Sequence, residues 1–400
     1  MKLIERPLYF NELKKLKNTP DIKIITGIRR CGKSKLMTSF AEYIKAEEPS
    51  SNIVYIDLTK LEHESLKEYH ALNEYIEAHY VPDVANYLMI DEVQMCDKFE
   101  LVINSLHSDN KFDIYITGSN AFLLSSDLAT LFTGRHMEIH VYPFSFKEFC
   151  TYYDNPTDIQ SALDDYIVNG GFAGSYIYND SESRAKYVKD VYETILIRDL
   201  VYKYKIGETL TIRRIGDYLM DCVGNISSFR NISNSLTNKT TETNHVTVGS
   251  YIKYLCNAFV FYEAKRFDVR GKTLLQSLNK YYLADTGLRF AILGKRNMDW
   301  GHMLENIVYI ELLRRGYDVY VGKLYNKEID FVAINNNSKI YIQVSDNISD
   351  KATFEREVKP LLQIRDAYPK MLLARTRYPD SDHEGVLIRD IARWLLQSEQ

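Results

Sequence analysis

The chain has 400 residues, of which 45% are hydrophobic and 26% are charged, and its formal net charge is −4. This composition is ordinary for a globular protein and excludes a collagen, a mucin-like stalk and a wholly disordered chain. The charge excludes a basic surface over the whole chain that would bind nucleic acid, but it does not exclude a local basic patch. The length predicts two or three domains.

The cysteines and the N-terminus indicate the cellular compartment of the protein. The five cysteines are odd in number and widely spaced, and no C-x-x-C pair occurs, so we expect neither a disulfide framework nor a zinc knuckle. The first residues lack the apolar core of a signal peptide. No apolar run approaches the ~20 residues of a membrane helix. We therefore expect a cytoplasmic protein that does not insert into a membrane.

The first 150 residues alternate between strand and helix patterns. Continuous apolar strands separated by helices indicate a parallel sheet that is covered on both faces. The short apolar runs predict strands at Ile22–Thr26, Ile53–Leu58, Tyr87–Ile90, Phe112–Thr117 and His136–Val141, and the helical periods predict helices at Lys33–Ala46 and Leu61–Tyr80.

A complete phosphate-loop pattern joins the first strand to the first helix. The pattern G-x-x-x-x-G-K-[ST] is matched at every fixed position by Gly27-Ile28-Arg29-Arg30-Cys31-Gly32-Lys33-Ser34. The glycines let the backbone fold around phosphate oxygens, which the loop amides and the helix N-terminus attract. Lys33 would neutralise the β and γ phosphates, and the Ser34 hydroxyl would be a ligand of Mg²⁺. The loop therefore predicts a nucleotide site with Mg²⁺.

A second motif of the same kind of site follows at Tyr87–Glu92. Four apolar residues bury the strand and bring Asp91 to its carboxyl end, where ligands bind in parallel sheets. Asp91 is expected to hold Mg²⁺ through water, and Glu92 to polarise the attacking water as a general base. Because Ile53–Leu58 lies between the two motifs in sequence, we expect one extra strand to separate the phosphate-loop strand from the Asp91 strand.

Together these residues resemble the AAA-type prokaryotic ATPases whose loop reads G-I-R-R-x-G-K-S. The resemblance spans nearly the whole chain and implies ATP as the nucleotide and ATP hydrolysis as the activity. Its downstream part is similar to a C-terminal domain of unknown function that is common in these ATPases. The further matching segments are Asp91–Gln94, Thr117–Asn120, Thr133–Arg135, Pro143–Phe149, Gly170–Phe172 and Leu304–Asn306.

The resemblance also implies roles for five polar or charged positions. Ser119 or Asn120 would sense the γ-phosphate at the end of a strand beside the Asp91 strand, or else would only build a turn. Arg135 would act as an arginine finger, in cis or from a neighbouring subunit, or else would form a structural ion pair. Arg29 and Arg30 would contact either phosphate or acidic neighbours.

The middle zone, residues 151–290, is mostly helical and ends in a strand pair. Two or three short helices followed by strands at Val260–Phe267 and Lys280–Leu283 are the layout of a winged helix. The helix at residues 246–258 could bind duplex DNA in the major groove, and residues 260–282 hold five basic and two acidic side chains. The alternative is a module that packs between domains, because few side chains of this region could contact DNA phosphates.

The last zone, residues 291–400, carries an acidic set that looks like a restriction-endonuclease-like fold. Its members are Glu305 on a helix, Glu328 and Asp330 on a strand and Gln343 on the next strand. In that fold such residues, together with an E-x-K element, bind Mg²⁺ and activate water at a phosphodiester. Here the element reads Gln343-Val344-Ser345, so a weaker ligand and the loss of lysine predict a vestigial site without cleavage.

The chain as a whole is expected to be an α/β protein of three domains. These are an AAA-type P-loop ATPase at 1–150, a helical and winged-helix region at 151–290 and a nuclease-like domain at 291–400. ATP hydrolysis would serve as a conformational switch. Two alternatives stay open, an ATP-gated Mg²⁺-dependent nuclease and an ATP-dependent regulator with little turnover. The candidate partners besides ATP are duplex DNA, a protein and a second copy of the chain.

Overall fold

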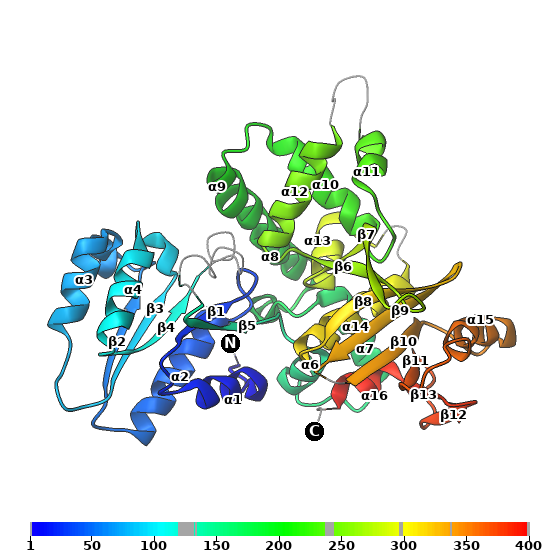
Figure 1. Ribbon diagram of the computed structural model, residues 1–400, viewed down its shortest axis with the longest axis horizontal. Helices are drawn as coiled ribbons and strands as arrows, with labels where there is room; N and C mark the ends of the chain where they lie inside the picture. The colour runs from blue at the N-terminus through cyan, green and yellow to red at the C-terminus, as the bar shows by residue number, and fades with distance from the viewer. Residues whose placement is uncertain are drawn as a thin grey trace. The chain divides into compact units, whose positions relative to one another are not determined.

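The computed structural model describes residues 2–118, 132, 134–236, 244–295, 299–336 and 338–397, and it omits the side chains of Gln276 and Ser277 (Figure 1). The chain divides into two compact units. The first unit is Leu3–Val141, and the second consists of Met1–Lys2 together with Tyr142–Gln400.

The first unit is built on a five-stranded parallel sheet in the order β2-β3-β4-β1-β5. The predicted parallel sheet is confirmed, and the strand that separates β1 from β3 is β4, while β2 lies at the edge beyond β3. The strands are β1 (Ile22–Thr26), β2 (Asn52–Asp57), β3 (Asn86–Asp91), β4 (Asp113–Thr117) and β5 (His136–His140), and the helices are α1 (Pro7–Leu16), α2 (Lys33–Glu47), α3 (Tyr69–Ala78) and α4 (Phe99–Asp109), with short 3₁₀ turns at Leu61–Lys67 and Val93–Met95.

Helices cover both faces of this sheet, as the continuous burial of its central strands requires. Every residue of β1 and β3 is buried. Ile114 and Ile116 belong to the same apolar cluster as residues of α3 and α4, whereas the ring of the intervening Tyr115 packs at a tilt against Phe40 of α2. Because side chains alternate along a strand, α3 with α4 and α1 with α2 lie on opposite sides of the sheet (Figure 1).

The helix predicted over Leu61–Tyr80 is instead broken into two pieces. A 3₁₀ segment runs from Leu61 to Lys67, and α3 begins at Tyr69. Glu68 has an extended backbone, and its carboxylate accepts a hydrogen bond from the backbone N–H of Ala71 (2.9 Å). The break is therefore a helix N-cap, which the apolar period does not reveal because both pieces bury the same side.

The second unit combines helices with an eight-stranded mixed sheet, in the order β12-β13-β11-β10-β9-β8-β6-β7 (Figure 1). The helices are α6 (Phe146–Tyr152), α7 (Ile159–Asn169), α8 (Ser181–Thr194), α9 (Tyr202–Tyr204), α10 (Thr209–Asp221), α11 (Phe229–Leu236), α12 (His245–Asn257), α13 (Thr286–Leu293), α14 (Trp300–Arg314), α15 (Lys351–Leu362) and α16 (Ile391–Leu396), with a 3₁₀ turn at Ala173–Ile177 and a π-helical segment at Ile195–Val201. The strands are β6 (Phe261–Asp268), β7 (Thr273–Leu283), β8 (Asp318–Leu324), β9 (Lys327–Asn335), β10 (Ser338–Ser345), β11 (Lys370–Ala374), β12 (Ser381–His383) and β13 (Val386–Asp390).

The β6–β7 hairpin differs from the separate wing that the sequence pattern suggests. It follows the three mutually packed helices α10, α11 and α12, in the order of a winged helix. However, β6 also pairs with β8 through residues 266–268 and 321–323, and Phe267 and Val269 pack into the apolar cluster of the C-terminal sheet. The hairpin therefore continues that sheet, and residue 290 falls inside α13 rather than between two separate sheets.

The Gly170-Gly171 pair ends α7 and begins a tight junction in the second unit. Gly170 is the C-cap, with a φ of 67°, and its N–H donates to the carbonyl oxygen of Tyr166 (2.8 Å). A Cβ on Gly171 would lie 2.2 Å from the carbonyl oxygen of Phe144. Glycine is required at both positions, one for its backbone conformation and one for close approach.

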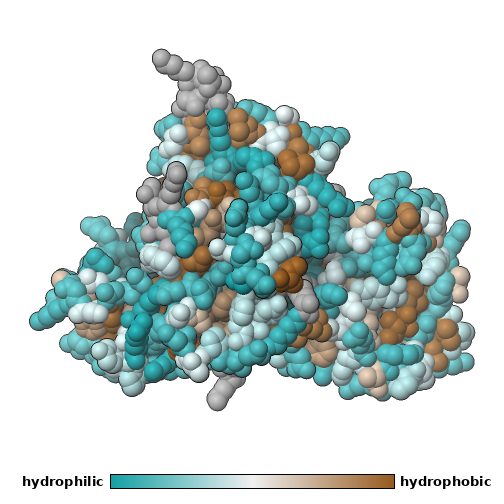
Figure 2. All heavy atoms as spheres, turned by 180° about the vertical axis from the view of Figure 1, so that it is seen from behind, coloured by the Kyte–Doolittle hydropathy of each residue, from teal (hydrophilic) through white to brown (hydrophobic). Residues whose placement is uncertain are grey.

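Among the described residues, the helices all lack the combination of length and apolar character that crossing a bilayer requires. Figure 2 shows one face of the molecule, on which hydrophobic side chains form small patches among hydrophilic ones. Scattered apolar side chains of this kind are normal on a protein surface.

Candidate functional site

The phosphate loop lies between β1 and α2 and depends on backbone conformations with positive φ. Gly27 has a φ of 138°, and a Cβ there would lie 2.1 Å from the carbonyl oxygen of Val141. Gly32 has a φ of 106° at the N-cap of α2, and Arg30 has a φ of 68°. Left-handed residues in such a loop form concave backbone sites for anions, next to the positive end of a helix. The geometry fits a phosphate group.

The side chains of the loop divide into buried and accessible ones. Ile28 and Cys31 are buried in the unit, whereas Arg29 is half-buried and Arg30 is exposed. Lys33 is buried, and its Nζ donates to the carbonyl oxygens of Gly27 (2.8 Å) and Ile28 (3.2 Å). The loop itself therefore holds the ammonium that would meet the phosphates.

Asp91 ends β3 in contact with residues from two other elements. Its carboxylate accepts hydrogen bonds from the Thr117 hydroxyl at the end of β4 and from the Ser34 hydroxyl at the start of α2. Burial raises the pKa of Asp91, and these two hydrogen bonds oppose the rise. The sheet order brings Ser34 and Asp91 together because β1 and β3 both end at this edge with one strand between them. A hydroxyl and a carboxylate side by side are ligands that suit Mg²⁺.

Glu92 follows Asp91 with a left-handed backbone, at a φ of 56° and a ψ of 48°. Its N–H donates to Thr117 Oγ1 (3.1 Å), and its carboxylate accepts a hydrogen bond from the Gln94 side chain (2.5 Å). A non-glycine residue in this region is strained, and such residues cluster at functional sites. Gln94 thus orients the carboxylate that is expected to polarise water.

Two further residues at this site were missed in the sequence. Arg6, before α1, donates from Nη1 to the carbonyl oxygen of Cys31 (3.0 Å) and is buried; no sequence signal marks it. His140 ends β5, with Nδ1 3.0 Å from Thr26 Oγ1. Burial, aided by the charge of Lys33, lowers the pKa of His140 to about 3, so the imidazole is neutral. The rule that ligands bind at the carboxyl ends of parallel strands could have found His140.

Of the remaining expected residues of the first unit, Arg135 is the one that the structure describes, and it does not join this edge. Ser119 and Asn120, the candidate sensors, lie outside the described residues. Arg135 is exposed and comes directly before β5, where its carbonyl oxygen accepts a hydrogen bond from the N–H of Ile22 (3.0 Å). Arg135 is therefore at the amino end of β1 and β5, whereas the phosphate loop is at their carboxyl end. This placement excludes action on its own loop.

The first unit thus presents residues that fit ATP and Mg²⁺. The loop backbone and Lys33 would hold the phosphates, Ser34 and Asp91 would hold the metal, and Glu92 would orient water. The bound metal would supply charge neutralisation for the terminal phosphate.

The second unit brings together the acidic residues of the expected nuclease-like site. Asp330 on β9 accepts a hydrogen bond from the N–H of Val344 (2.8 Å), and the Gln343 side chain accepts one from the N–H of Asp330 (3.3 Å). Glu305 on α14 and Glu328 on β9 both contact Lys280 of β7. In the described part of the chain, no three His, Cys, Asp or Glu side chains are arranged to hold a metal ion.

Lys280 was not among the residues expected at this site, and the electrostatics of the cluster centre on it. Burial by itself would lower the pKa of Lys280, but the carboxylates of Glu305, Asp330 and Glu328 outweigh it and raise this pKa. Burial, and then the charge of Glu305, raises the pKa of Asp330 well above its ordinary value, while Lys280 opposes the rise. A lysine in the middle of a strand near an acidic helix is not a signal that sequence alone supplies.

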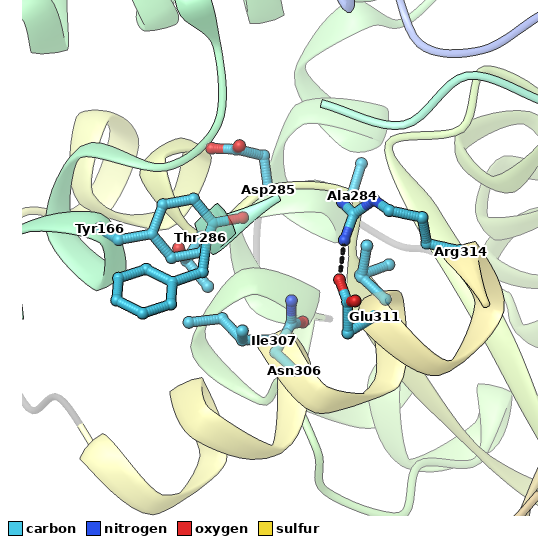
Figure 3. Close-up of a pocket in the computed structure, with 10 residues that line it drawn as sticks. Tyr166, Ala284, Asp285, Thr286, Asn306, Ile307, Glu311 and Arg314 are labelled. Carbon is cyan, nitrogen blue, oxygen red and sulfur yellow. Dashed lines mark hydrogen bonds and ion pairs between the residues drawn. The ribbon is translucent and has the colours of Figure 1, made fainter. Parts of the chain in front are cut away.

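A small cavity at the Gly170-Gly171 junction does not offer a ligand site. Figure 3 shows Asp285 above α14, with Glu311 and Arg314 paired beside it. The cavity volume of about 10 Å³ leaves room for roughly one water molecule. Asp285 accepts hydrogen bonds from the N–H groups of Gly171 and Gly287, and burial raises the pKa of Asp285 to about 7. These contacts hold the junction together.

Comparisons with known proteins agree with the geometry of the first unit. Residues 19–150 match a family described as an AAA domain, and residues 160–299 match a domain of unknown function, DUF8612. The Aeropyrum pernix ORC1 protein in complex with DNA has 11% identity and a TM-score of 0.32, covering 74% of this chain and 93% of that chain. AMPPCP-bound DnaA from Aquifex aeolicus has 17% identity and a TM-score of 0.31, covering 62% and 86%. Structural likeness at this level carries no argument about function.

Two uncharacterized proteins align with most of the chain. The one from Methanocaldococcus jannaschii, MJ1544, is 28% identical over 374 residues, which cover 90% of this chain and 80% of that protein. The one from Haemophilus influenzae is 36% identical over 402 residues, which cover 99% of each. Because this alignment spans nearly both chains, the chain belongs to the same family as the Haemophilus influenzae protein, and in this chain residues 19–150 form the AAA domain.

Proposed function

We propose that the first unit binds ATP with Mg²⁺ and hydrolyses the γ-phosphate. Lys33 neutralises charge on the β and γ phosphates, Ser34 and Asp91 hold the metal, and Glu92 orients the attacking water. Arg135 completes the site of a neighbouring copy of the chain, so that turnover requires association of subunits.

The observation that carries this proposal is the contact between Ser34 and Asp91. The two residues are 57 positions apart in sequence, and only the parallel order of β1, β4 and β3 places the hydroxyl against the carboxylate. A hydroxyl at the start of the loop helix and a carboxylate on a neighbouring strand are the Mg²⁺ ligands of P-loop nucleotide hydrolases. A glycine-containing turn that binds no phosphate would require neither Ser34 nor Asp91.

The test is ATP turnover and ATP binding by the full chain with three variants. Lys33→Ala should abolish both, because the phosphates lose their point charge. Glu92→Gln should keep binding while turnover falls, because the amide cannot accept a proton. Lys35→Ala is the matched control, since Lys35 is exposed on the same helix two residues away. Wild-type turnover by Lys33→Ala would refute the proposal.

Hydrolysis most simply serves as a switch between two states of the protein. Contacts to the γ-phosphate hold loops that relax when the phosphate leaves. Limited proteolysis of the Glu92→Gln variant should therefore give different fragment patterns with ATP and with ADP. Identical patterns with both nucleotides would contradict a switch.

A second candidate function is association with duplex DNA through the second unit. Lys253 on α12 and Lys265, Arg270 and Lys272 on the β6–β7 hairpin are all exposed, which gives a locally basic surface in an acidic chain. Neutralising phosphates with such side chains makes binding depend on salt. Duplex DNA should raise ATP turnover at low salt, and the double variant Arg270→Ala/Lys272→Ala should lose this stimulation. Turnover indifferent to DNA would direct the search to a protein partner.

In the second unit, Glu305 lies on α14, Asp330 on β9 and Gln343 on β10. We infer that this part of the chain is a binding or coupling module. The E-x-K lysine position holds Ser345, whose hydroxyl donates to the carbonyl oxygen of Asn347 (3.2 Å), and a hydroxyl cannot supply the ammonium that assists water attack.

A further inference from the structure

The acidic cluster of the second unit holds a lysine in its centre. Lys280 Nζ lies 2.9 Å from Glu305 Oε1 and 2.6 Å from Glu328 Oε1. Lys280 is only 3% exposed, and Glu305 and Asp330 are also buried. The ammonium therefore bridges the buried carboxylate of Glu305 and the partly exposed carboxylate of Glu328, at the place where a metal-dependent phosphodiesterase would hold its cation.

Several other polar atoms of the cluster have protein partners. Glu305 Oε1 also accepts a hydrogen bond from the Tyr282 hydroxyl, and Asp330 Oδ2 accepts one from the N–H of Val344. The Gln343 amide group donates to Glu357 Oε2 (3.1 Å). Since Mg²⁺ demands near-ideal octahedral coordination by oxygen, a metal ion would have to displace several of these contacts together with the ammonium.

A loop between α10 and α11 closes over the same cluster. Ser227 forms an antiparallel bridge with Asn279 of β7. Gly224 has a φ of 76°, and a Cβ there would lie 3.3 Å from Glu305 Oε2 and 3.0 Å from His302 Cδ2. The loop thus approaches Glu305 so closely that only glycine fits comfortably, and it covers the carboxylate that a phosphodiester would need to approach.

We propose that Lys280 is the permanent cation of this cluster, which excludes divalent metal and makes the nuclease-like part of the second unit a closed, metal-independent module. The ammonium supplies the charge balance that Mg²⁺ supplies in nucleases of this type. Because it is covalently attached to β7, it also ties the hairpin to α14 and β9. The inference concerns the second unit alone, so it stands or falls separately from ATP hydrolysis in the first.

The charges around Lys280 predict what its removal would do. Without the ammonium, Glu305, Glu328 and Asp330 would face one another with no compensating charge. Buried carboxylates in that state are costly, and a bound cation or protons would relieve the cost. Replacing Lys280 by a small neutral residue should therefore open a divalent-cation site that the wild-type chain lacks.

The experiment uses the full chain without nucleotide and Mn²⁺ as the probe. Calorimetric titration should show no Asp330-dependent Mn²⁺ binding in the wild type, so that wild type and Asp330→Asn give the same result. Lys280→Ala should gain one site, which Lys280→Ala/Asp330→Asn should lose. The melting temperature of Lys280→Ala in EDTA should be lower than that of the wild type. It should rise with Mn²⁺, by about 5 °C at a hundredfold excess over the dissociation constant. Any site in the first unit cancels in these pairwise comparisons.

Lys272→Ala is the matched control, because Lys272 is an exposed lysine of the same hairpin, and it should gain no site. Asp330-dependent Mn²⁺ binding by the wild type would overturn the proposal, as would Mn²⁺-dependent DNA cleavage that is lost on Asp330→Asn. A folded Lys280→Ala chain that binds no additional Mn²⁺ would also overturn it. If Lys280→Ala does not fold, Lys280→Gln, which is uncharged and one atom shorter but keeps an N–H donor group, takes its place, and the same outcomes decide.

Discussion

Arg135 provides a test of how the first unit assembles its hydrolytic site. The carbonyl oxygen of Arg135 accepts a hydrogen bond from Ile22, the first residue of β1. The phosphate loop begins at Gly27, directly after the last residue of β1. At about 3.3 Å per residue, the five residues of β1 separate the Arg135 backbone from its own loop by ~16 Å. An arginine side chain does not span that distance, so an action of Arg135 on phosphate would require the loop of a neighbouring subunit.

Arg135→Ala should bind ATP normally but lose turnover by about 10³- to 10⁵-fold, the usual contribution of an arginine finger. Lys33→Ala should be inactive for a different reason, because its own loop is damaged. In a random 1:1 mixture, about 25% of sites combine an intact loop with an intact neighbouring arginine. ATP turnover of the mixture should therefore recover to roughly a quarter of the wild-type value, and it should rise with protein concentration.

The control is Arg135→Ala mixed with the double variant Lys33→Ala/Arg135→Ala, which contains no intact arginine and should stay inactive. Two results would refute the reasoning. Wild-type turnover by Arg135→Ala would make the residue a structural arginine. Inactivity of both single variants without recovery on mixing would show that no neighbour supplies it.

Three further predictions follow from buried contacts. Gly27→Ala should abolish ATP binding in an equilibrium assay, because its Cβ would collide with a backbone carbonyl; normal affinity would contradict this geometry. Lys23→Met should destabilise the first unit by about 3–5 kcal/mol in urea unfolding, since it removes the cation from Asp113, whose side chain is only 8% exposed, whereas Lys351→Met on the surface should change little. For Asp285, burial raises the pKa from 3.8 to about 7, so its contribution to stability is full below pH 4 and is lost as the pH rises to 7. The stability advantage of the wild type over Asp285→Asn, measured by urea unfolding at pH 5 to 8, should accordingly shrink with rising pH; a constant difference would contradict the shifted pKa.

Much of the first unit follows from local patterns. The observed bounds of β1 are those predicted, Ile22–Thr26, and β3, β4 and β5 differ from their predicted bounds by one residue at an end or both. Fully apolar runs indicate strands buried on both faces, and such strands require a parallel sheet with helices on each side. By contrast, the break at Glu68 was not predicted, because it depends on one side chain capping a helix rather than on the apolar period.

The residues of the candidate site likewise divide into those that the sequence pattern reveals and those that it does not. The loop residues and the Asp91-Glu92 pair were recognisable because their chemistry depends on a short, continuous stretch of chain. Arg6 and Lys280 were not, because each reaches its partners from a distant segment. His140 lies between these cases, since its position at the end of a parallel strand is a signal that the pattern does contain.

The sequence by itself determined the phosphate loop, the strands that lead to it and the presence of a second, mixed part of the chain. These depend on interactions between residues close in sequence, such as backbone conformation and apolar periodicity. Only the tertiary structure decided that Arg135 lies at the opposite end of β1 from its own loop, that the β6–β7 hairpin continues the C-terminal sheet, and that Lys280 fills the acidic cluster. Each of these depends on strand order and pairing between distant segments, which hydrogen bonds and burial fix only once the chain has folded.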